Sequence, residues 1–132
     1  LCDLDGTLAL LNGRNPFDAS TCENDLPNLP VLNLVKMYSN AGFKVLLVSG
    51  RMDSYRDQTI QWLEKYQVEY SQLYMRKAND QRKDSIIKRE IFDANINGNY
   101  FVETILDDRN QVVDMWRNEL QLPCFQVYYG DF

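Results

Sequence analysis

Apolar residues gather in short runs along the chain, and these runs alternate with segments in which apolar residues recur at helical spacing. The runs predict strands at 43–48, 68–75, 101–106 and 124–128, of which 43–48 is buried on both faces and 68–75 alternates apolar with polar residues. The other segments predict helices across 31–40, 54–66, 86–92 and 112–120. Strands that alternate with helices form parallel βαβ units with right-handed crossovers. The pattern therefore predicts an α/β fold, with helices on both faces of a three-layer, Rossmann-like parallel sheet.

Each predicted helix carries apolar side chains that should face the sheet. In the first two helices these are Leu32, Val35, Tyr38, Ile60 and Leu63, together with Tyr55 or Trp62. In the last two they are Ile86, Ile87, Ile91, Phe92, Val112, Val113, Trp116 and Leu120. The turn residues at 12–18 predict a loop.

Length and composition indicate one domain, 1–132, because 132 residues can bury about two-thirds of their unfolded surface. The chain has no histidine, so carboxylates must do any acid–base work. A net charge of −5 argues against strong non-specific binding to nucleic acid. No apolar run approaches the ~20 residues of a membrane span, and the three cysteines lack metal-site spacing. We expect a cytoplasmic protein with reduced thiols and no membrane partner.

The chain begins close to its first chemically interesting residues. A strand usually runs ~5–6 residues, yet only Leu1 and Cys2 precede Asp3. We expect the polypeptide to extend further back, through a few strand residues or an entire preceding domain.

Asp3 and Asp5 are followed directly by Gly6 and Thr7. Asp is disfavoured inside strands and Gly permits a sharp turn. Both carboxylates should therefore project from the carboxyl end of a buried strand, where open α/β sheets bind ligands. There Asp3 could be a nucleophile and Asp5 a proton donor and acceptor, and the pair could hold a divalent cation. The alternative is a polar turn closed by an Asx-type hydrogen bond.

Ser49, Gly50 and Arg51 follow the predicted strand at 43–48. A hydroxyl and exposed backbone N–H groups at a strand end suit a phosphate oxygen. The alternative for Ser49 is a helix N-cap. Arg14, in the loop after the first aspartates, is either a phosphate clamp or a solvated loop arginine.

Lys88 lies four residues after Asp84 on a predicted helix. Asp84 could form an ordinary i,i+4 salt bridge with Lys88, or could orient it toward a phosphate. Asp107 and Asp108 follow the strand at 101–106, and adjacent carboxylates repel unless a cation or basic group offsets them. Two aspartate pairs at two strand ends are most simply explained by one metal site.

These motifs, in this order, resemble those of the haloacid dehalogenase-like (HAD) phosphatase superfamily. Longer stretches resemble the 3′-phosphatase half of phage-type polynucleotide kinase/phosphatases. They are D-L-D-G-T-L-A at 3–9, N-G-R-N-P-F-D at 12–18, V-S-G-R at 48–51, R-K-D-S-I-I-K-R-E-I-F at 82–92, L-D-D-R-N-Q-V-V-D-M-W-R at 106–117 and C-F-Q-V-Y-Y-G-D-F at 124–132. The kinase half, with its glycine-rich phosphate loop, is absent from this sequence.

The resemblance implies a magnesium-dependent phosphatase of nucleic-acid repair that removes a 3′-phosphate from a polynucleotide end or a nucleotide. Asp3 would attack phosphorus and form an aspartyl-phosphate. Asp5 would protonate the leaving hydroxyl and then activate water. The magnesium ion (Mg2+) would be held by Asp3, the Asp5 carbonyl, Asp107 and the nearby Asp108.

The resemblance also implies residues that hold the substrate phosphate. They are Thr7, Arg14, Ser49, Gly50, Arg51 and Lys88, with Asp84 positioning Lys88. The predicted helices and strands fill residues 8–43, after the first motif, and residues 52–87, before Lys88. No large cap domain therefore fits in either segment. The site should be open, so a polynucleotide end could enter it. A kinase domain could belong to the same polypeptide, and a phage-encoded protein would act in the host cytoplasm.

Two other functions remain open at this point. One is a phosphatase for another small phosphate ester, and the other is a non-catalytic domain that binds nucleic acid or a partner. Intact Asp3 and Asp5 argue against the second. The only basic concentration is Arg76, Lys77, Arg82 and Lys83, which either lines the route of a nucleic-acid strand or is a solvated face.

Overall fold

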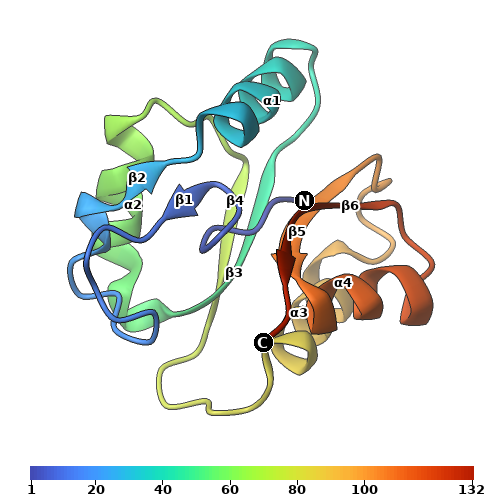
Figure 1. Ribbon diagram of the computed structural model, residues 1–132. Coiled ribbons are helices and arrows are strands. Elements are labelled where there is room, and N and C mark those ends of the chain that lie inside the picture. Colours follow the sequence, from blue (N-terminus) through green and yellow to red (C-terminus); the bar gives the residue numbers. More distant parts are fainter.

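A parallel sheet runs through the centre of the computed structural model, which describes residues 1–132 (Figure 1). The strands are β3 (Leu46–Met52), β4 (Gln72–Arg76), β5 (Ile105–Arg109) and β6 (Cys124–Gly130). β3 pairs with β4 and β5 pairs with β6, in each case in parallel. Cys2 forms parallel bridges to both β3 and β5. The order across the sheet is therefore β4, β3, the N-terminal segment, β5 and β6.

Backbone hydrogen bonds hold the N-terminal segment between the two inner strands. The Cys2 N–H donates to the Leu46 carbonyl (2.9 Å), and the Val48 N–H donates to the Cys2 carbonyl (3.0 Å). On the other side, the Asp3 N–H donates to the Leu106 carbonyl (3.0 Å). Asp3 therefore lies where the central strand position ends, at the carboxyl edge of the sheet.

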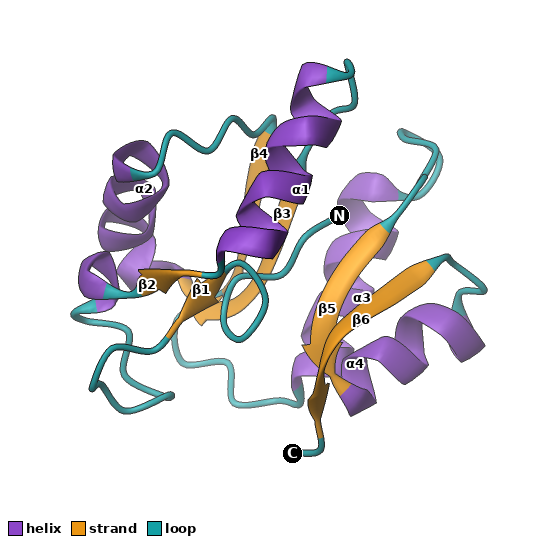
Figure 2. Ribbon diagram, turned by 45° about the horizontal axis from the view of Figure 1, so that its top comes forward, coloured by secondary structure: helices purple, strands orange, loops and turns teal.

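Helices cover both faces of the sheet (Figure 2). They are α1 (Leu29–Asn40), α2 (Arg56–Lys65), α3 (Asp84–Ile91) and α4 (Asn110–Asp114). Successive strand residues point to opposite faces. Leu47 accordingly joins the core under α1 and α2, while Leu46 and Val48 join the core under α3 and α4. Two cores on two faces of one sheet confirm the predicted three-layer α/β architecture.

β3 differs from its predicted bounds in a way that affects the site. It begins at Leu46 rather than Phe43, and it continues through Ser49 and Gly50 to Met52. The prediction that Ser49 and Gly50 end the strand was wrong, because a polar residue ends an apolar run in the sequence without ending the backbone ladder. The register with β4 shifts after Ser49, so the last part of β3 is irregular.

The later strands are also displaced along the chain. β5 spans 105–109 rather than 101–106, so Asp107 and Asp108 lie within the strand instead of following it, and Phe101 is exposed. β4 covers 72–76 rather than 68–75, and β6 continues past 128 to Gly130. Buried aspartates inside β5 are unusual for a strand interior, which is why the sequence pattern placed them outside it.

The helices agree more closely with their predictions. α1 begins two residues earlier than predicted, and α3 and α4 each continue into a π-helical turn, Phe92–Ile96 and Met115–Glu119 respectively. Ile87 is buried but Ile86 is exposed, because neighbouring helical residues point about 100° apart. The prediction that Ile86 faces the sheet was therefore wrong. None of the helices has the length and apolar character needed to cross a membrane.

A short antiparallel hairpin, β1 (Ala9–Leu10) with β2 (Leu26–Pro27), was not predicted. One tight turn joins Asp3 to it, in which the Leu4 carbonyl accepts from the Thr7 N–H. Gly6 makes this turn possible with φ of +80°. The hairpin and α1 fill the chain between the first motif and β3, and α2 and β4 fill the chain between β3 and α3. The fold has no cap domain, as predicted.

Candidate active site

Three carboxylates and one ammonium group converge at the carboxyl edge of the sheet. Asp3 follows the central strand position, Asp107 and Asp108 come from the adjacent β5, and Lys88 comes from α3. Lys88 Nζ lies 2.8 Å from Asp3 Oδ1 and 3.0 Å from Asp107 Oδ2. All four residues are buried, and Lys88 is 0% exposed. The sheet order brings together four residues that are predicted from motifs up to 105 positions apart.

Thr7 and Gly6 shape the floor of this cluster. Thr7 Oγ1 lies 3.0 Å from Asp3 Oδ2 and 3.2 Å from Asp108 Oδ1, so its hydroxyl can donate to either carboxylate. A side chain on Gly6 would overlap the Asp108 carboxylate. Glycine is therefore required here both for its backbone conformation and for the close approach of Asp108.

If all three carboxylates of the cluster are ionised, they outnumber its one ammonium group. Burial raises the pKa of Asp3 well above its ordinary value, and Asp107 and Asp108 act in the same direction against Lys88. Burial also raises the pKa of Asp108. Burial alone would lower the pKa of Lys88, but Asp107 and Asp3 outweigh it and keep this lysine charged. Ionising all three carboxylates around one ammonium would leave excess negative charge in a buried place, which bound protons or a divalent cation would offset.

The donor atoms of the cluster suit magnesium. Oxygen atoms from Asp3, Asp107 and Asp108 all lie within 4.8 Å of one another. Mg2+ prefers oxygen ligands and is commonly held by one or two carboxylates together with waters and substrate phosphate. The carboxylates of Asp3, Asp107 and Asp108, three of the predicted metal ligands, therefore lie together. The Asp5 side chain instead contacts Arg14 and Arg51.

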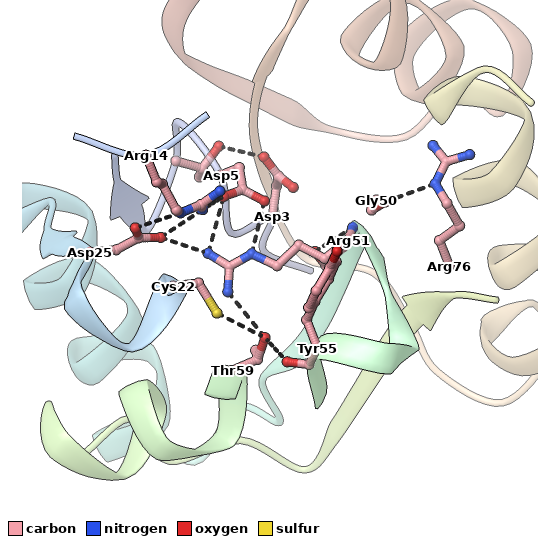
Figure 3. A network of polar contacts seen from close by, with 12 residues as sticks. Asp3, Asp5, Arg14, Cys22, Asp25, Gly50, Arg51, Tyr55, Thr59 and Arg76 are labelled. Atoms are coloured by element: carbon pink, nitrogen blue, oxygen red, sulfur yellow. Dashed lines mark hydrogen bonds and ion pairs between the residues drawn. The ribbon is translucent and has the colours of Figure 1, made fainter. Parts of the chain in front are cut away.

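Asp5 belongs to a second network, with Arg14 and Arg51 (Figure 3). Arg14 Nη2 lies 2.7 Å from Asp5 Oδ1, and Arg51 Nε lies 2.9 Å from Asp5 Oδ2. Burial opposes ionisation of Asp5, but Arg51 and then Arg14 outweigh it and hold its pKa below the usual range. The Asp5 side chain is 34% exposed, while those of Arg14 and Arg51 are 5% and 3% exposed. Asp5 is therefore the part of this network that solvent, or a substrate, can reach.

Asp25, from the turn before β2, anchors both arginines and was missed from the sequence. Its carboxylate accepts two hydrogen bonds from Arg14, each 2.8 Å long, and one of 3.0 Å from Arg51. Thr59 accepts a further hydrogen bond from Arg51 (3.1 Å), and Trp62 donates to the Asp25 backbone carbonyl (2.8 Å). Asp25 is 1% exposed. The sequence carries no pattern that identifies Asp25, because Asp25 contacts the two arginines only once the β1–β2 hairpin has folded over the first motif.

Replacing Asp25 with Asn should lower kcat/KM by on the order of 10²-fold, because a small displacement of catalytic groups is enough for such a loss. The neutral amide cannot hold both guanidinium groups, so Arg14 and Arg51 would shift relative to Asp5. Steady-state kinetics of the purified variant measure the effect. Asp57→Asn, which changes an exposed carboxylate on α2, is the matched control and should retain wild-type kinetics. Equal kinetics for both variants would contradict the anchoring role.

Ser49, Gly50 and Asp84 occupy the side of the site next to α3. Ser49 is buried, and its Oγ accepts the Arg51 N–H (3.1 Å) rather than capping a helix. A side chain on Gly50 would overlap Asp84. Asp84 Oδ2 lies 3.8 Å from Lys88 Nζ, so the predicted i,i+4 pair forms at long range. Asp84 Oδ1 is buried and has no hydrogen-bond partner.

Gly50→Ala should reduce kcat/KM at least about tenfold, because the new methyl group displaces Asp84 and, through it, Lys88. A double-mutant cycle with Asp84→Ala measures this coupling. If displacement of Asp84 is the cause, adding Gly50→Ala to Asp84→Ala should change kcat/KM little. Additive losses would contradict this explanation.

The basic residues before α3 are largely paired within the protein. Arg82 lies 2.9 Å from Asp80 and 2.6 Å from Glu90, and Arg76 donates to the Gly50 carbonyl (2.8 Å). Lys77 and Lys83 are exposed. The prediction that this cluster lines the route of a nucleic-acid strand now rests on these two lysines rather than on all four basic residues.

The sequence profile of the family described as the polynucleotide kinase PNKP phosphatase domain matches residues 1–132. The chain belongs to this family. Its fold is accordingly that of HAD-like phosphatases, as the motifs predict. The PNKP phosphatase family indicates a phosphomonoester hydrolase.

Several proteins similar to this chain have names that refer to RNA repair or RNA ligation. A chain in two solved structures of a Pnkp1/Rnl/Hen1 complex, one described as an RNA repair complex, is 62% identical over 99% of this chain with a TM-score of 0.97. A protein of Autographa californica nuclear polyhedrosis virus named as a bifunctional polynucleotide kinase/RNA ligase is 36% identical over 126 residues, 93% of this chain. The present chain spans 42% and 46% of the two Pnkp1/Rnl/Hen1 chains and 18% of the viral protein.

Proposed function

We propose that this domain is a magnesium-dependent phosphatase that removes a 3′-phosphate from a polynucleotide end or a nucleotide through an aspartyl-phosphate. The observation that carries the proposal is the convergence of Asp3, Lys88, Asp107 and Asp108 in a chain that the PNKP phosphatase profile matches from end to end. The names of the relatives favour RNA as the polynucleotide. A kinase domain in the same polypeptide would be consistent with relatives that are longer than this chain.

Asp3 and Asp5 divide the chemistry between them. An oxygen of Asp3 attacks phosphorus, the bond from phosphorus to the 3′-oxygen breaks, and Asp5 gives its proton to that oxygen. Asp5 then takes a proton from water as the water attacks the aspartyl-phosphate, so that inorganic phosphate leaves and Asp3 is restored. The low pKa of Asp5 favours its ionised form in the substrate-free protein, which is the form that the second step requires. For the first step, Asp5 takes up a proton from solvent or from the phosphate monoanion as the substrate binds, because the negative charge of the phosphate raises the pKa of a neighbouring carboxyl.

The remaining residues stabilise the negative charge that develops on the phosphoryl group during transfer. Lys88 and the Thr7 hydroxyl lie against Asp3, and Ser49 lies within the neighbouring strand β3, where the register with β4 begins to shift. We propose that these groups contact phosphoryl oxygens during the transfer. Asp3, Asp107 and Asp108 would hold Mg2+, joined by the Asp5 carbonyl. When bound, the ion would neutralise part of the charge on the carboxylates and the phosphoryl oxygens.

Arg14 and Arg51 are proposed to act through Asp5 rather than as free phosphate clamps. Both guanidinium groups are buried and form ion pairs with Asp5 and Asp25. They fix the Asp5 carboxylate beside Asp3 and add positive potential to the place where the substrate phosphate binds. The fold has no cap domain, so the end of a polynucleotide can reach Asp5 directly.

A substrate comparison tests this function. A 3′-phosphorylated RNA oligonucleotide, the matching DNA, a 3′-mononucleotide, a 5′-phosphorylated oligonucleotide and p-nitrophenyl phosphate are compared by kcat/KM with Mg2+ and with EDTA. The expected result is magnesium-dependent release of phosphate from 3′-phosphorylated substrates, with the oligonucleotide preferred. Similar values for all esters would favour a general small-ester phosphatase, and no turnover of any substrate would favour a non-catalytic binding domain.

A further inference from the structure

The indole N–H of Trp116 is buried and donates to the Asp107 carboxylate. Trp116 is 1% exposed, and its Nε1 lies 3.3 Å from Asp107 Oδ2. A buried indole N–H needs an acceptor, but a backbone carbonyl satisfies that need equally well. The other tryptophan, Trp62, does donate to a backbone carbonyl, that of Asp25. Trp116 instead donates to a carboxylate of the cluster formed by Asp3, Asp107 and Asp108.

Asp107 receives hydrogen bonds on both of its oxygens. The Asp108 N–H donates to Asp107 Oδ1 (2.9 Å), and Lys88 Nζ donates to Oδ2 (3.0 Å) beside Trp116. Lys88 also lies against Asp3, so it can shift toward that residue or toward a substrate phosphate. Trp116 makes no such alternative polar contact. Its N–H is therefore the side-chain donor that can keep Asp107 in one orientation while Lys88 moves.

Trp116 lies in an irregular part of the helix that follows β5. α4 starts directly after β5 and continues into the π-helical turn Met115–Glu119, in which the Leu120 N–H donates to the Met115 carbonyl (3.2 Å). Single π-helical turns are rare and frequently occur at functional sites. Phe92 packs edge-on against the ring, with centroids 6.2 Å apart, and this contact fixes the ring plane.

We propose that Trp116 is a positioning residue of the metal site: its N–H orients Asp107 and thereby sets the affinity of the site for Mg2+. The inference rests on the proposed function, because it takes Asp107 as a ligand of the ion. Partners that orient metal ligands commonly contribute about 10–100-fold to metal affinity. The long N–H···O distance places the expected contribution of Trp116 near the lower end, about tenfold.

Trp116→Phe removes the donor and keeps an aromatic ring. Calorimetric titration of the substrate-free protein with Mg2+ should show about tenfold weaker binding, and the Mg2+ concentration for half-maximal turnover should rise by a similar factor. kcat at saturating Mg2+ should change little. Trp62→Phe removes an equally buried indole N–H from the other network and should bind Mg2+ as tightly as the wild type.

A purely structural role for Trp116 gives a different result. In that case Trp116→Phe would lower the melting temperature measured without Mg2+ and leave the affinity of the folded protein for Mg2+ unchanged. This outcome would overturn the inference. Benzothienylalanine at position 116 keeps the bicyclic shape and replaces the N–H with sulfur, so it tests the donor even if Trp116→Phe fails to fold. Wild-type protein that binds no Mg2+ would overturn the metal site itself, whereas unchanged binding in both variants would overturn only the role of Trp116.

Discussion

Asp3→Asn is expected to abolish turnover, lowering kcat by on the order of 10⁴-fold or more. An amide cannot attack phosphorus, although its volume is nearly that of the carboxylate. Asp3 is buried and its pKa is raised by burial, so removing its charge should leave the folded state intact. Single-turnover kinetics with a 3′-phosphorylated oligonucleotide measure the loss, and circular dichroism checks the fold.

The same variant should still bind its substrate, because the other groups around the phosphate are unchanged. Equilibrium binding of a 3′-phosphorylated oligonucleotide to Asp3→Asn therefore separates lost chemistry from lost binding. If Asp3→Asn released phosphate at a rate near that of the wild type, the covalent mechanism would be wrong and water would have to attack phosphorus directly.

Lys88→Met should remove activity and also weaken the fold in the absence of metal. Lys88 is the one cation against Asp3 and Asp107, and removing one partner of a buried ion pair typically costs about 3–5 kcal/mol. Loss of one preorganised charge at the phosphoryl group should lower kcat by roughly 10²–10³-fold. Urea unfolding in EDTA measures the first effect, and kinetics at saturating Mg2+ measure the second.

Mg2+ should restore part of the stability of Lys88→Met, because an ion that binds only the folded state stabilises it by mass action. Arg82→Met is the control for loss of a positive charge: the Arg82 side chain is 49% exposed, and exposed ion pairs contribute at most about 1 kcal/mol. If Lys88→Met were as stable in EDTA as Arg82→Met, Lys88 would not be what balances the carboxylates.

Motif order was sufficient to predict the main cluster of the site. Asp3, Asp107 and Asp108 are distant in the sequence, but the carboxyl ends of neighbouring parallel strands meet at one edge, so alternating strands and helices predict their proximity. Lys88 lies on a helix, and only its position in the motif order of the family predicted that it joins them. The same pattern predicts both helical layers. The strand bounds were less accurate, since Ser49 and Asp107 lie inside strands although polar residues usually mark strand ends.

Contacts that depend on loops could not be predicted. Asp25 reaches Arg14 and Arg51 only because an unpredicted hairpin folds over the first motif. The arginines therefore appear in the sequence as free phosphate clamps, whereas the structure shows them buried against carboxylates. Trp116 was predicted only as part of the apolar face of a helix, and its hydrogen bond to Asp107 depends on the local π-helical turn.

The structure separates the proposed chemistry into two networks, centred on two aspartates that lie two positions apart in the sequence. Lys88, Asp107 and Asp108 surround Asp3, the proposed nucleophile, while Arg14, Arg51 and Asp25 hold Asp5, the proposed acid and base. This separation explains why one motif can carry two carboxylates with opposite electrostatic environments: the pKa of Asp3 is raised and that of Asp5 is lowered.

Trapping the covalent intermediate tests the central claim most directly. Asp5→Asn should slow hydrolysis of the aspartyl-phosphate, so this variant is mixed with a 3′-phosphorylated RNA oligonucleotide and Mg2+ and then quenched with borohydride, which reduces an aspartyl-phosphate to homoserine. Peptide mass spectrometry is predicted to find homoserine at position 3, and only when both the 3′-phosphate and Mg2+ are present. Homoserine at another aspartate, or phosphate release without any modification of Asp3, would contradict the proposed mechanism.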